Sequence, residues 1–520
     1  MEKGREYLKK RNNGIGSVGK LILKINKYFR PVMVKRFIIV LFSLILFTSN
    51  LFSLNHSFSI DFNLLYNFKD EIFSLYNATV DNFLTMGIKI GYESENFTFI
   101  ASINAANDEI YNDQFSEGYY SGFYFNFGEA LINYRISNSL ISFGKCNLGG
   151  IVYSPYTLFI SSMKYPRNVL EYRYEDDKFI YITRWIELNN LESALANSEK
   201  YRSANYKIYA IKLENFRFGY EEINVYVGKN FDFEYFANPV PGFFIQYVNH
   251  NGRPFSEGLG ETNFLMGFFA DYTEKDKYLY LELLIDDINM NRFLYPGSFQ
   301  NPDKIAWSFG GSFDSNIGRL SIYNAGATKY TFQPSSESGN NVYYGYTYFP
   351  YLTYQKNSKT MIFPPELLYA GYKYGENNIA ILFEYVPKYF LGMEPDSITK
   401  LAKLSVEYVI LGERSPVNPW NEASTFPEGT HLLDDSVLEH RLLTSFYLNY
   451  PINDLKHKYF SGIELTLNVL LQATIGYIWN KSELIEVSSD NSKKPLLRPV
   501  EGNNTPYFSL FFGTNLKISF

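Results

Sequence analysis

The chain contains almost no cysteine. Cys146 is the single cysteine among 520 residues, so no intrachain disulfide can form, and no Cys-x-x-Cys pair or Cys/His cluster offers a zinc or redox site. A lipoprotein needs a cysteine directly after its export signal, and Cys146 lies far from the N-terminus. We therefore expect no disulfide framework and no lipid attached at Cys146.

Long hydrophobic runs are also scarce. Hydrophobic residues make up 46% of the chain and aromatic residues 18%, yet the mean hydropathy is only -0.20. Apolar and polar residues therefore alternate along most of the sequence. This combination is typical of strands with one wet face and one lipid-facing face. A large soluble β-sandwich is the alternative.

One apolar run stands apart from this pattern. Residues 37–47 (FIIVLFSLILF) carry no charge, and Lys35 and Arg36 precede them. A short apolar run behind a basic segment is typical of a secretory signal peptide, whereas a membrane-spanning helix needs about 20 apolar residues. We expect a cleaved signal peptide at residues 33–54 and a mature chain from residue 55.

Residues 1–32 are rich in Lys and Arg and end directly before Met33. They are either a basic arm for nucleic acid or anionic lipid, or an N-terminal extension called too early, with Met33 as the true initiator. We prefer the second interpretation. The whole chain has a net charge of -6, and removal of this basic leader makes the mature chain more acidic. An acidic exported chain is a poor partner for nucleic acid, whose binding depends on phosphate neutralisation.

The mature chain alternates from its first residues. Phe58, Ile60 and Phe62 share one face of an expected strand, while Ser59 and Asp61 point the other way. The pattern returns at residues 84–92, 97–103, 130–136, 179–185, 206–213, 277–285 and 379–385. Short polar clusters, such as residues 93–96 and 175–178, separate several of these segments and indicate turns between antiparallel strands.

The last segment alternates up to the final residue. Leu516, Ile518 and Phe520 lie on one face, with Lys517 and Ser519 on the other. Together with the signal peptide and the alternating strands, this ending resembles the bacterial outer-membrane β-barrels, whose last strand ends on an aromatic residue. The resemblance implies a Gram-negative outer-membrane location, contact with membrane lipid, and recognition by periplasmic chaperones and the barrel-assembly machinery. Leu516, Ile518 and Phe520 are the candidate assembly signal.

Length then sets the number of strands. At roughly 25–29 residues for each strand and its connection, residues 55–520 predict an all-β, transmembrane antiparallel β-barrel of about 16–18 strands in one domain. Such a barrel is wide enough for an aqueous lumen unless loops fill it. We expect long loops, which lie outside the barrel or fold into its lumen, at residues 144–167, 188–203, 238–260, 333–350 and 414–439, with a short helix in the second of these.

Catalytic motifs are missing from the sequence. The five histidines form no His-Glu-x-x-His motif, and the sequence contains neither Gly-x-Ser-x-Gly nor the His-Ser-Asn-Gly cluster of outer-membrane phospholipases. We therefore expect no enzyme activity, no metal site and no cofactor.

Basic residues inside the alternating segments are the better functional candidates. A lipid-facing Arg at the membrane midplane costs about 2–4 kcal/mol, so these residues are expected to face the lumen. Six form this set of candidate lumen charges: Arg135, Arg173, Arg184, Lys207, Lys212 and Arg217. They either form a basic ladder that guides anionic solutes or are paired with Glu171, Glu175 or Glu222.

The leading hypothesis is an outer-membrane channel, or porin, for small polar solutes. The alternatives are a surface-glycan or lipid-handling barrel without an open pore, or a surface adhesin. Residues 144–161 (GKCNLGGIVYSPYTLFIS), followed by two strands, resemble the capsule-assembly barrels over a small part of the chain, and the resemblance assigns no residue a role. An open lumen favours the channel, and a filled lumen favours the glycan- or lipid-handling barrel.

Overall fold

The computed structural model describes most of the mature chain. The described residues are 56–69, 82–106, 123–161, 166–190, 201–250, 262–287, 302–333, 345–348, 353–356, 359–362, 368–389, 401–415, 429–452, 464–489 and 492–519. The chain divides into two units, Met1–His56 and Ser57–Phe520. The expected extension at residues 1–32 and the expected signal peptide at residues 33–54 lie outside the described residues.

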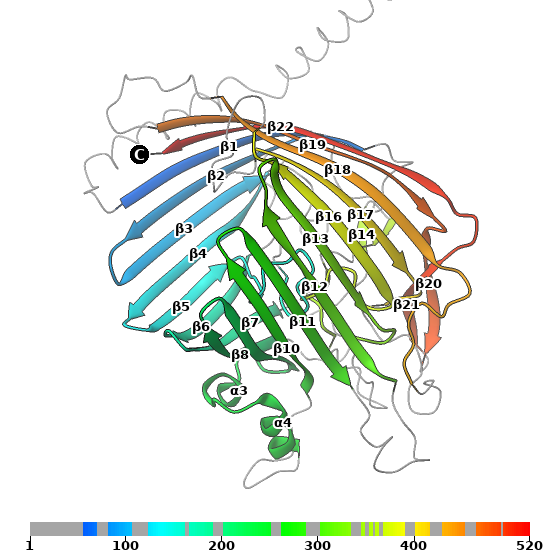
Figure 1. Ribbon diagram of the computed structural model, residues 1–520, viewed down its shortest axis with the longest axis horizontal. Coiled ribbons are helices and arrows are strands. Elements are labelled where there is room, and N and C mark those ends of the chain that lie inside the picture. The colour runs from blue at the N-terminus through cyan, green and yellow to red at the C-terminus, as the bar shows by residue number, and fades with distance from the viewer. Residues whose placement is uncertain are drawn as a thin grey trace, which may run out of the picture. The chain divides into compact units, whose positions relative to one another are not determined.

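Strands dominate the second unit (Figure 1). The first nine are β1 (His56–Lys69), β2 (Asn82–Glu93), β3 (Phe97–Ala106), β4 (Tyr124–Ile136), β5 (Ser139–Cys146), β6 (Arg167–Glu175), β7 (Phe179–Asn190), β8 (Tyr201–Leu213) and β9 (Phe216–Val227). The helices α3 (Phe233–Ala237) and α4 (Gly242–His250) follow β9. The remaining strands are β10 (Thr262–Glu274), β11 (Lys277–Asp287), β12 (Lys304–Asp314), β13 (Gly318–Ala327), β14 (Thr353–Lys356), β15 (Lys359–Ile362), β16 (Asn378–Pro387), β17 (Ala402–Leu411), β18 (Glu439–Ile452), β19 (Glu464–Trp479), β20 (Ser482–Ser489), β21 (Ser492–Pro499) and β22 (Thr505–Ser519).

Eighteen of these strands form one sheet that closes on itself. The 18-stranded sheet runs in chain order from β1 to β13 and then through β16, β17, β18, β19 and β22. The last strand returns to the first, with antiparallel pairing from Ser59 opposite Ser519 to Lys69 opposite Ser509. The two remaining strand pairs, β14 with β15 and β20 with β21, are separate hairpins in the long connections. The expected antiparallel barrel of about 16–18 strands is therefore confirmed.

The two ends of the barrel differ in the length of their connections. Short turns join β2 to β3, β4 to β5, β6 to β7, β8 to β9, β10 to β11 and β12 to β13. Ser137 and Glu214 have positive φ values of 50° and 45°, which tight hairpin turns require. Long connections lie at the other end. In bacterial barrels the short turns face the periplasm and the long loops face outward.

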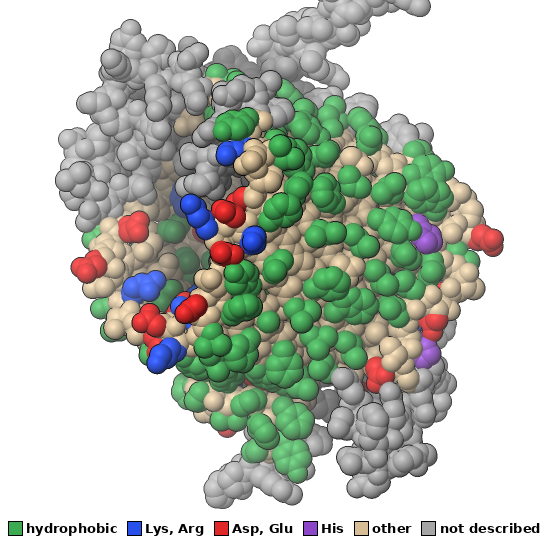
Figure 2. Space-filling model, viewed as in Figure 1, with side chains coloured by type: hydrophobic (Ala, Val, Ile, Leu, Met, Phe, Trp, Pro, Cys, Tyr) green, Lys and Arg blue, Asp and Glu red, His purple; other side chains and the backbone are tan. Residues whose placement is uncertain are grey.

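Alternation gives the wall an apolar outer face. In β11, Leu279 and Leu281 are 55% and 52% exposed, whereas Tyr280 between them is 5% exposed. Figure 2 shows hydrophobic side chains spread over the outer wall, beside a hollow where acidic and basic side chains gather. The exposed face is the lipid-facing band of a transmembrane barrel, since a soluble domain rarely leaves so large an apolar surface uncovered.

The core of the molecule lies inside the ring of strands. Long connections after β5 and between β13 and β16 bring fully buried side chains together with the inward faces of the wall, among them Tyr156, Leu158, Phe159, Tyr346 and Tyr372. Each fully buried apolar side chain of this size contributes about 1.5–3 kcal/mol. We call the described parts of these connections, residues 147–161, 328–333, 345–348 and 368–377, the lumen plug.

Two segments expected to be loops contain regular secondary structure. The segment at residues 188–203 is strand at both ends, because β7 extends to Asn190 and β8 begins at Tyr201. The expected helix between them falls on residues 191–200, outside the described residues. The segment at 238–260 contains α4 instead of irregular loop over Gly242–His250. No helix among the described residues is long and apolar enough to cross a membrane.

Candidate functional site

The first part of the lumen plug crosses the barrel. On the β7 side, Arg184 Nη1 donates to Gly149 O at 3.1 Å. Tyr156 OH donates to Glu407 Oε1 of β17 at 2.6 Å. Seven strands separate β7 from β17 on one side of the ring and nine on the other, so these contacts join nearly opposite walls. Burial, together with the neighbouring Glu407 carboxylate, raises the pKa of Tyr156 well above its usual value, so its hydroxyl stays a donor.

A second part of the plug meets the first at close range. The Leu158 amide donates to Glu282 Oε2 of β11 at 2.9 Å. A Cβ atom at Gly371 would lie 1.7 Å from Leu158 O, so the two segments can only cross where one has no side chain. Beside the crossing, the amide of Ser161 donates to Ala370 O at 2.8 Å. These contacts hold the crossing segments as one packed layer.

A third part is held by an arginine that the sequence analysis did not select. Arg202 of β8 is fully buried. Its Nη2 atom donates to Thr347 O at 3.0 Å and to Gly345 O. Tyr346 OH in turn donates to Phe159 O of the first segment. Arg202 was missed because residues 188–203 were interpreted as a loop, and the direction of a side chain in a loop cannot be inferred from its position in the sequence.

Four of the six candidate lumen charges face inward with carboxylate partners. Arg184 pairs with Glu171, which lies opposite it on β6. Arg173 Nη2 and Lys212 Nζ approach the two oxygens of Glu175 at 2.5 and 2.9 Å. On β9, Arg217 Nε donates to Asp271 Oδ1 at 3.0 Å. Arg184, Arg173 and Lys212 therefore pair with two of the glutamates named in the pairing interpretation, whereas Arg217 pairs with Asp271, which that interpretation did not name. Charges of alternating sign replace a purely basic ladder.

Lys207 corrects the expectation for a fifth residue. It shares its face of β8 with Ile211 and Leu213, which are exposed on the lipid-facing wall, so its side chain points away from the lumen. Its Nζ atom donates to Asn238 O at 2.7 Å and Val240 O at 2.9 Å. A lysine on the outer wall is tolerated here because backbone carbonyl groups of the β9–β10 connection receive its hydrogen bonds. Glu222, which lies opposite Lys207 on β9, shares this outer location.

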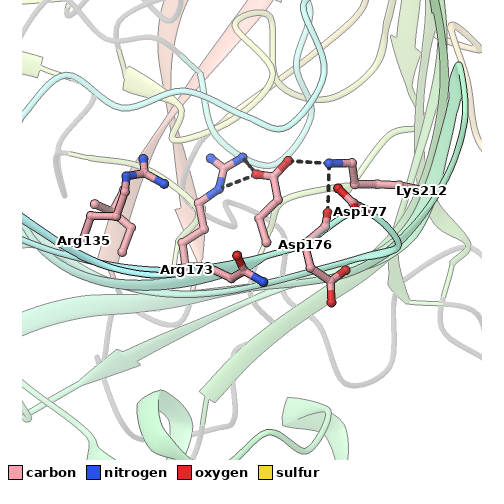
Figure 3. Close-up of a pocket in the computed structure, with 8 residues that line it drawn as sticks. Arg135, Arg173, Asp176, Asp177 and Lys212 are labelled. Carbon is pink, nitrogen blue, oxygen red and sulfur yellow. Dashed lines mark hydrogen bonds and ion pairs between the residues drawn. The ribbon is translucent and has the colours of Figure 1, made fainter. Parts of the chain in front are cut away.

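Arg135 lines a cavity at the short-turn mouth. The cavity holds about 580 Å³ and is lined by Arg135, Asn138, Leu140, Arg173, Glu175, Asp176, Asp177 and Lys212. Figure 3 shows the labelled basic side chains rising from the barrel wall on the same side of the sheet. Backbone amides of Lys178 and Phe179 donate to Asp176 and lower the pKa of its carboxyl. No ion-pair partner is found for Arg135 among the described residues, which leaves its guanidinium available to a ligand.

An aromatic surface continues from this cavity along the inner wall. Lys212 lies opposite Arg217, and Arg217 lies opposite Asp271, to which Tyr278 OH donates at 3.4 Å. The ring of Tyr153, from the plug, packs edge-on against Tyr278 with 5.5 Å between ring centroids. Tyr153 is 73% exposed although it belongs to the plug. The plug thus presents the exposed ring of Tyr153 near Arg217 and Asp271, at the end of the barrel where the short turns lie.

The other predicted residues stay untested. Leu516 lies in β22 opposite Phe62 of β1 and Leu467 of β19, so it belongs to the strand that closes the barrel. Ile518 lies opposite Ile60 in the same pairing, and Phe520 is outside the described residues. Their role as an assembly signal remains a prediction. The described part of the chain holds no group of three or more His, Cys, Asp or Glu residues suited to a metal ion.

The chain is similar to several solved structures at low sequence identity. No family model matches the chain, and no curated protein matches it. Wzi, an Escherichia coli outer-membrane protein involved in group 1 capsule assembly and described as a carbohydrate-binding β-barrel, is 12% identical, with a TM-score of 0.45 over 89% of this chain and 84% of that chain. The outer-membrane protein OpdK from Pseudomonas aeruginosa is 8% identical, with a TM-score of 0.43 over 90% of this chain and 100% of that one. OccAB4 from Acinetobacter baumannii is 10% identical, with a TM-score of 0.43 over 90% and 98%.

Proposed function

We propose that this outer-membrane β-barrel is an occluded binding protein that holds a glycan at its short-turn, periplasmic mouth, without acting as a diffusion pore or an enzyme. The observation that carries this proposal is the crossing of the lumen by residues 148–161. Their hydrogen bonds reach from Arg184 on β7 to Glu407 on β17, and Tyr156 and Leu158 are fully buried between the walls. A solute that diffuses freely needs a wet path, and buried aromatic packing removes it along this diameter.

The chemistry of the mouth favours a carbohydrate. Pyranose rings present an apolar C–H face and a rim of hydroxyl groups, which suit an exposed aromatic ring beside planar charged groups. Tyr153 supplies the exposed ring, with Tyr278 packed against it. Arg135 supplies a guanidinium that can form two parallel hydrogen bonds to a uronic-acid carboxylate. A polymer that carries both neutral and acidic sugars fits this combination.

The first test measures conductance in planar bilayers. We expect the folded wild-type protein to give no discrete current steps, and a variant in which residues 153–160 are replaced by a Gly-Ser linker to give them. The matched control replaces the turn residues 501–504 by the same kind of linker and should stay silent. Heat-modifiable migration on unboiled gels confirms that each variant is folded. Steps of equal size in wild type and linker variant would instead support the channel hypothesis.

The second test measures binding directly. Alginate, a uronic-acid polymer, and dextran, a neutral one, are titrated against detergent-solubilised protein by calorimetry. We expect alginate to bind more tightly than dextran, and Tyr153→Ala to weaken both by about tenfold, the loss of roughly 1.4 kcal/mol. Arg135→Gln should weaken alginate alone. Equal binding of both polymers by wild type and both variants would place the ligand elsewhere and contradict the proposal.

A further inference from the structure

Residues 230–248, which contain α3 and most of α4, pack against the outside of the barrel. Trp185 Nε1 donates to Asn230 O at 2.5 Å, and Thr183 Oγ1 donates to Phe236 O at 2.8 Å. Both side chains lie on the same face of β7 as Phe179, which is exposed on the outer wall. In Figure 1 the two helices lie at the lower end of the strands labelled β8 and β10. We call residues 230–248 the outer helical segment.

The contact continues across three more strands. Asn205 Nδ2 of β8 donates to Tyr235 O at 2.9 Å. Tyr235 stacks on Tyr226 of β9 with 6.0 Å between ring centroids. Phe243 of α4 packs against Phe264 of β10 at 6.2 Å, and Phe264 shares its face of the strand with exposed Phe268. The segment therefore covers a continuous area of the outer wall from β7 to β10.

Beneath the segment lies a polar patch that lipid could not cover. Lys207, Glu222 and Asn205 are all fully buried there. The amide of Gly242 donates to Glu222 Oε1 at 2.8 Å, and Lys207 donates to two carbonyl groups of the segment. An uncovered lysine at mid-membrane depth costs about 2–4 kcal/mol. Lys207 is near the middle of β8, so the segment extends about halfway along the strand, well below the rim.

The opposite side of the segment is largely apolar and uncovered, with Glu234 as its exposed charged side chain. Seven side chains are between 40% and 71% exposed: Phe231, Phe233, Val240, Phe243, Phe244, Tyr247 and Val248. The acidic Asp232 is occupied as the N-cap of α3, accepting from the amides of Glu234 and Tyr235. This apolar surface continues directly into the lipid-facing wall at Phe218 and Phe268.

We propose that the outer helical segment is embedded in the outer leaflet and binds lipid acyl chains through Phe233, Phe243 and Phe244. A helix with aromatic side chains on one face and polar contacts on the other is the arrangement that partitions into a membrane boundary. Acyl chains are the occupant because they cover the same face of β9 and β10 immediately beside the segment. The proposal is independent of what the lumen binds.

The test places a fluorophore on the segment in proteoliposomes. In a Cys146→Ser background, the variants Phe244→Cys and Phe233→Cys are labelled with NBD and mixed with doxyl-labelled phosphatidylcholine. Phe309→Cys, on the exposed outer face of β12, is the lipid reference, and Glu501→Cys, in an exposed turn, is the water reference. We expect doxyl quenching at residues 244 and 233 to lie within about twofold of residue 309 and several-fold above residue 501.

Three other outcomes would overturn the proposal. Quenching by aqueous iodide equal to that at residue 501 would place the segment in water. Protection from both quenchers, with a disulfide-linked dimer in unlabelled Phe244→Cys protein, would identify a second copy of the chain as the occupant. Protection from both quenchers without a dimer would show that the segment folds away from lipid. Unboiled gel migration separates all three from misfolding, and the labels at two positions guard against loss of one variant.

Discussion

Two neighbouring glutamates in β9 show how differently the two faces of the wall are used. Glu221 points into the barrel and accepts a hydrogen bond from Tyr206 OH at 2.6 Å. Glu222 points outward and accepts one from the amide of Gly242 at 2.8 Å. Both side chains are fully buried. One is covered by the lumen plug, and the other is covered by the outer helical segment.

The partners differ because the surroundings differ. Inside, charged side chains meet other side chains, as in the pairs of Arg217 with Asp271 and of Lys373 with Glu407. Outside, lipid offers no hydrogen-bond partner, so the polar groups of the wall must be satisfied by the covering segment itself. Its backbone does this through the carbonyl groups that accept from Lys207 and Asn205. Inside, ion pairs between side chains join the wall and the plug, whereas outside Lys207, Asn205 and Glu222 bind backbone groups of the covering segment.

The largest effect is expected on the outer face. Glu222→Gln removes the negative charge beside Lys207 and keeps an oxygen for the Gly242 amide, so it leaves a buried cation uncompensated. We expect a loss of about 3 kcal/mol in the free energy of unfolding, measured by urea titration with unboiled gels. The double variant Lys207→Met/Glu222→Gln leaves neither of these two charges at the patch and should recover most of this loss. Equal loss in the single and double variants would mean that charge is not the cause.

A smaller effect is expected where an inner cation binds backbone. Arg202→Met leaves the carbonyl groups of Gly345 and Thr347 without their donor inside the barrel. Unsatisfied buried acceptors cost about 1–3 kcal/mol, and we expect a loss near the middle of this range. The matched control is Arg319→Met, which breaks an exposed pair with Asp314 and should cost less than about 1 kcal/mol. If the two variants lose the same stability, the plug is not anchored by Arg202.

The third prediction concerns one hydroxyl of the plug. Tyr156→Phe removes the hydrogen bond to Glu407 but leaves Lys373, whose Nζ lies 2.7 Å from the same oxygen. We expect a loss of about 1.5 kcal/mol, because the remaining cation still neutralises the carboxylate. Tyr153→Phe, at the exposed ring of the same segment, should leave the urea midpoint unchanged. A greater loss at Tyr153 than at Tyr156 would reverse the assignment of the buried and open sides of the plug.

The smallest effect is a pH dependence at a short turn, outside both covered faces. The pKa of Asp176 is lowered by backbone amides, so its ionised form stabilises the β6–β7 turn above the ordinary aspartate pKa of about 3.9. That stability is lost as the pH falls through the lowered value. Asp176→Asn should therefore flatten the dependence of the urea midpoint between about pH 5 and pH 2. Asp177→Asn is the control and should follow wild type; a flattened curve for both would contradict the role of Asp176.

The comparison also shows how far the sequence could be interpreted. Alternation predicted the barrel, and Arg184, which was expected to face inward, donates to Gly149 O of the lumen plug. It failed at Lys207 because both faces of β8 are apolar: Tyr206 and Ile208 alternate with Tyr209 and Ile211. Where a strand is covered on both sides, a period of two no longer identifies the lipid-facing side. Because the outer helical segment covers the outer face of β8, the sequence of this strand does not show which of its faces points outward.

The plug was accessible to sequence analysis only as an irregular segment. Gly and Pro residues between 144 and 167 predicted a long loop, and the described residues 147–161 form an irregular connection between β5 and β6. Its direction was not predictable, since a loop over the rim and a loop into the lumen can have the same composition. Burial of Tyr156 and Phe159 depends on Glu407 and Gly371, which lie more than two hundred residues further along the chain. Contacts of that range leave no local pattern.

The seam between β1 and β22 places a condition on the order of assembly. Ser59 pairs with Ser519, so the ring cannot close until the last residues have been synthesised and exported. The entropy cost of joining β1 to β22 grows only with the logarithm of the chain length between them, so the length of the chain adds little to the free energy of closure. What delays closure is the order of synthesis. The plug segments all precede β17 in the chain, so they are already present when β1 pairs with β22. Pairing of β1 with β22 therefore encloses the plug segments inside the ring of strands. A chain truncated before β22 would leave the same segments on an open sheet, available to proteases, and this offers the cell a simple distinction between finished and unfinished barrels.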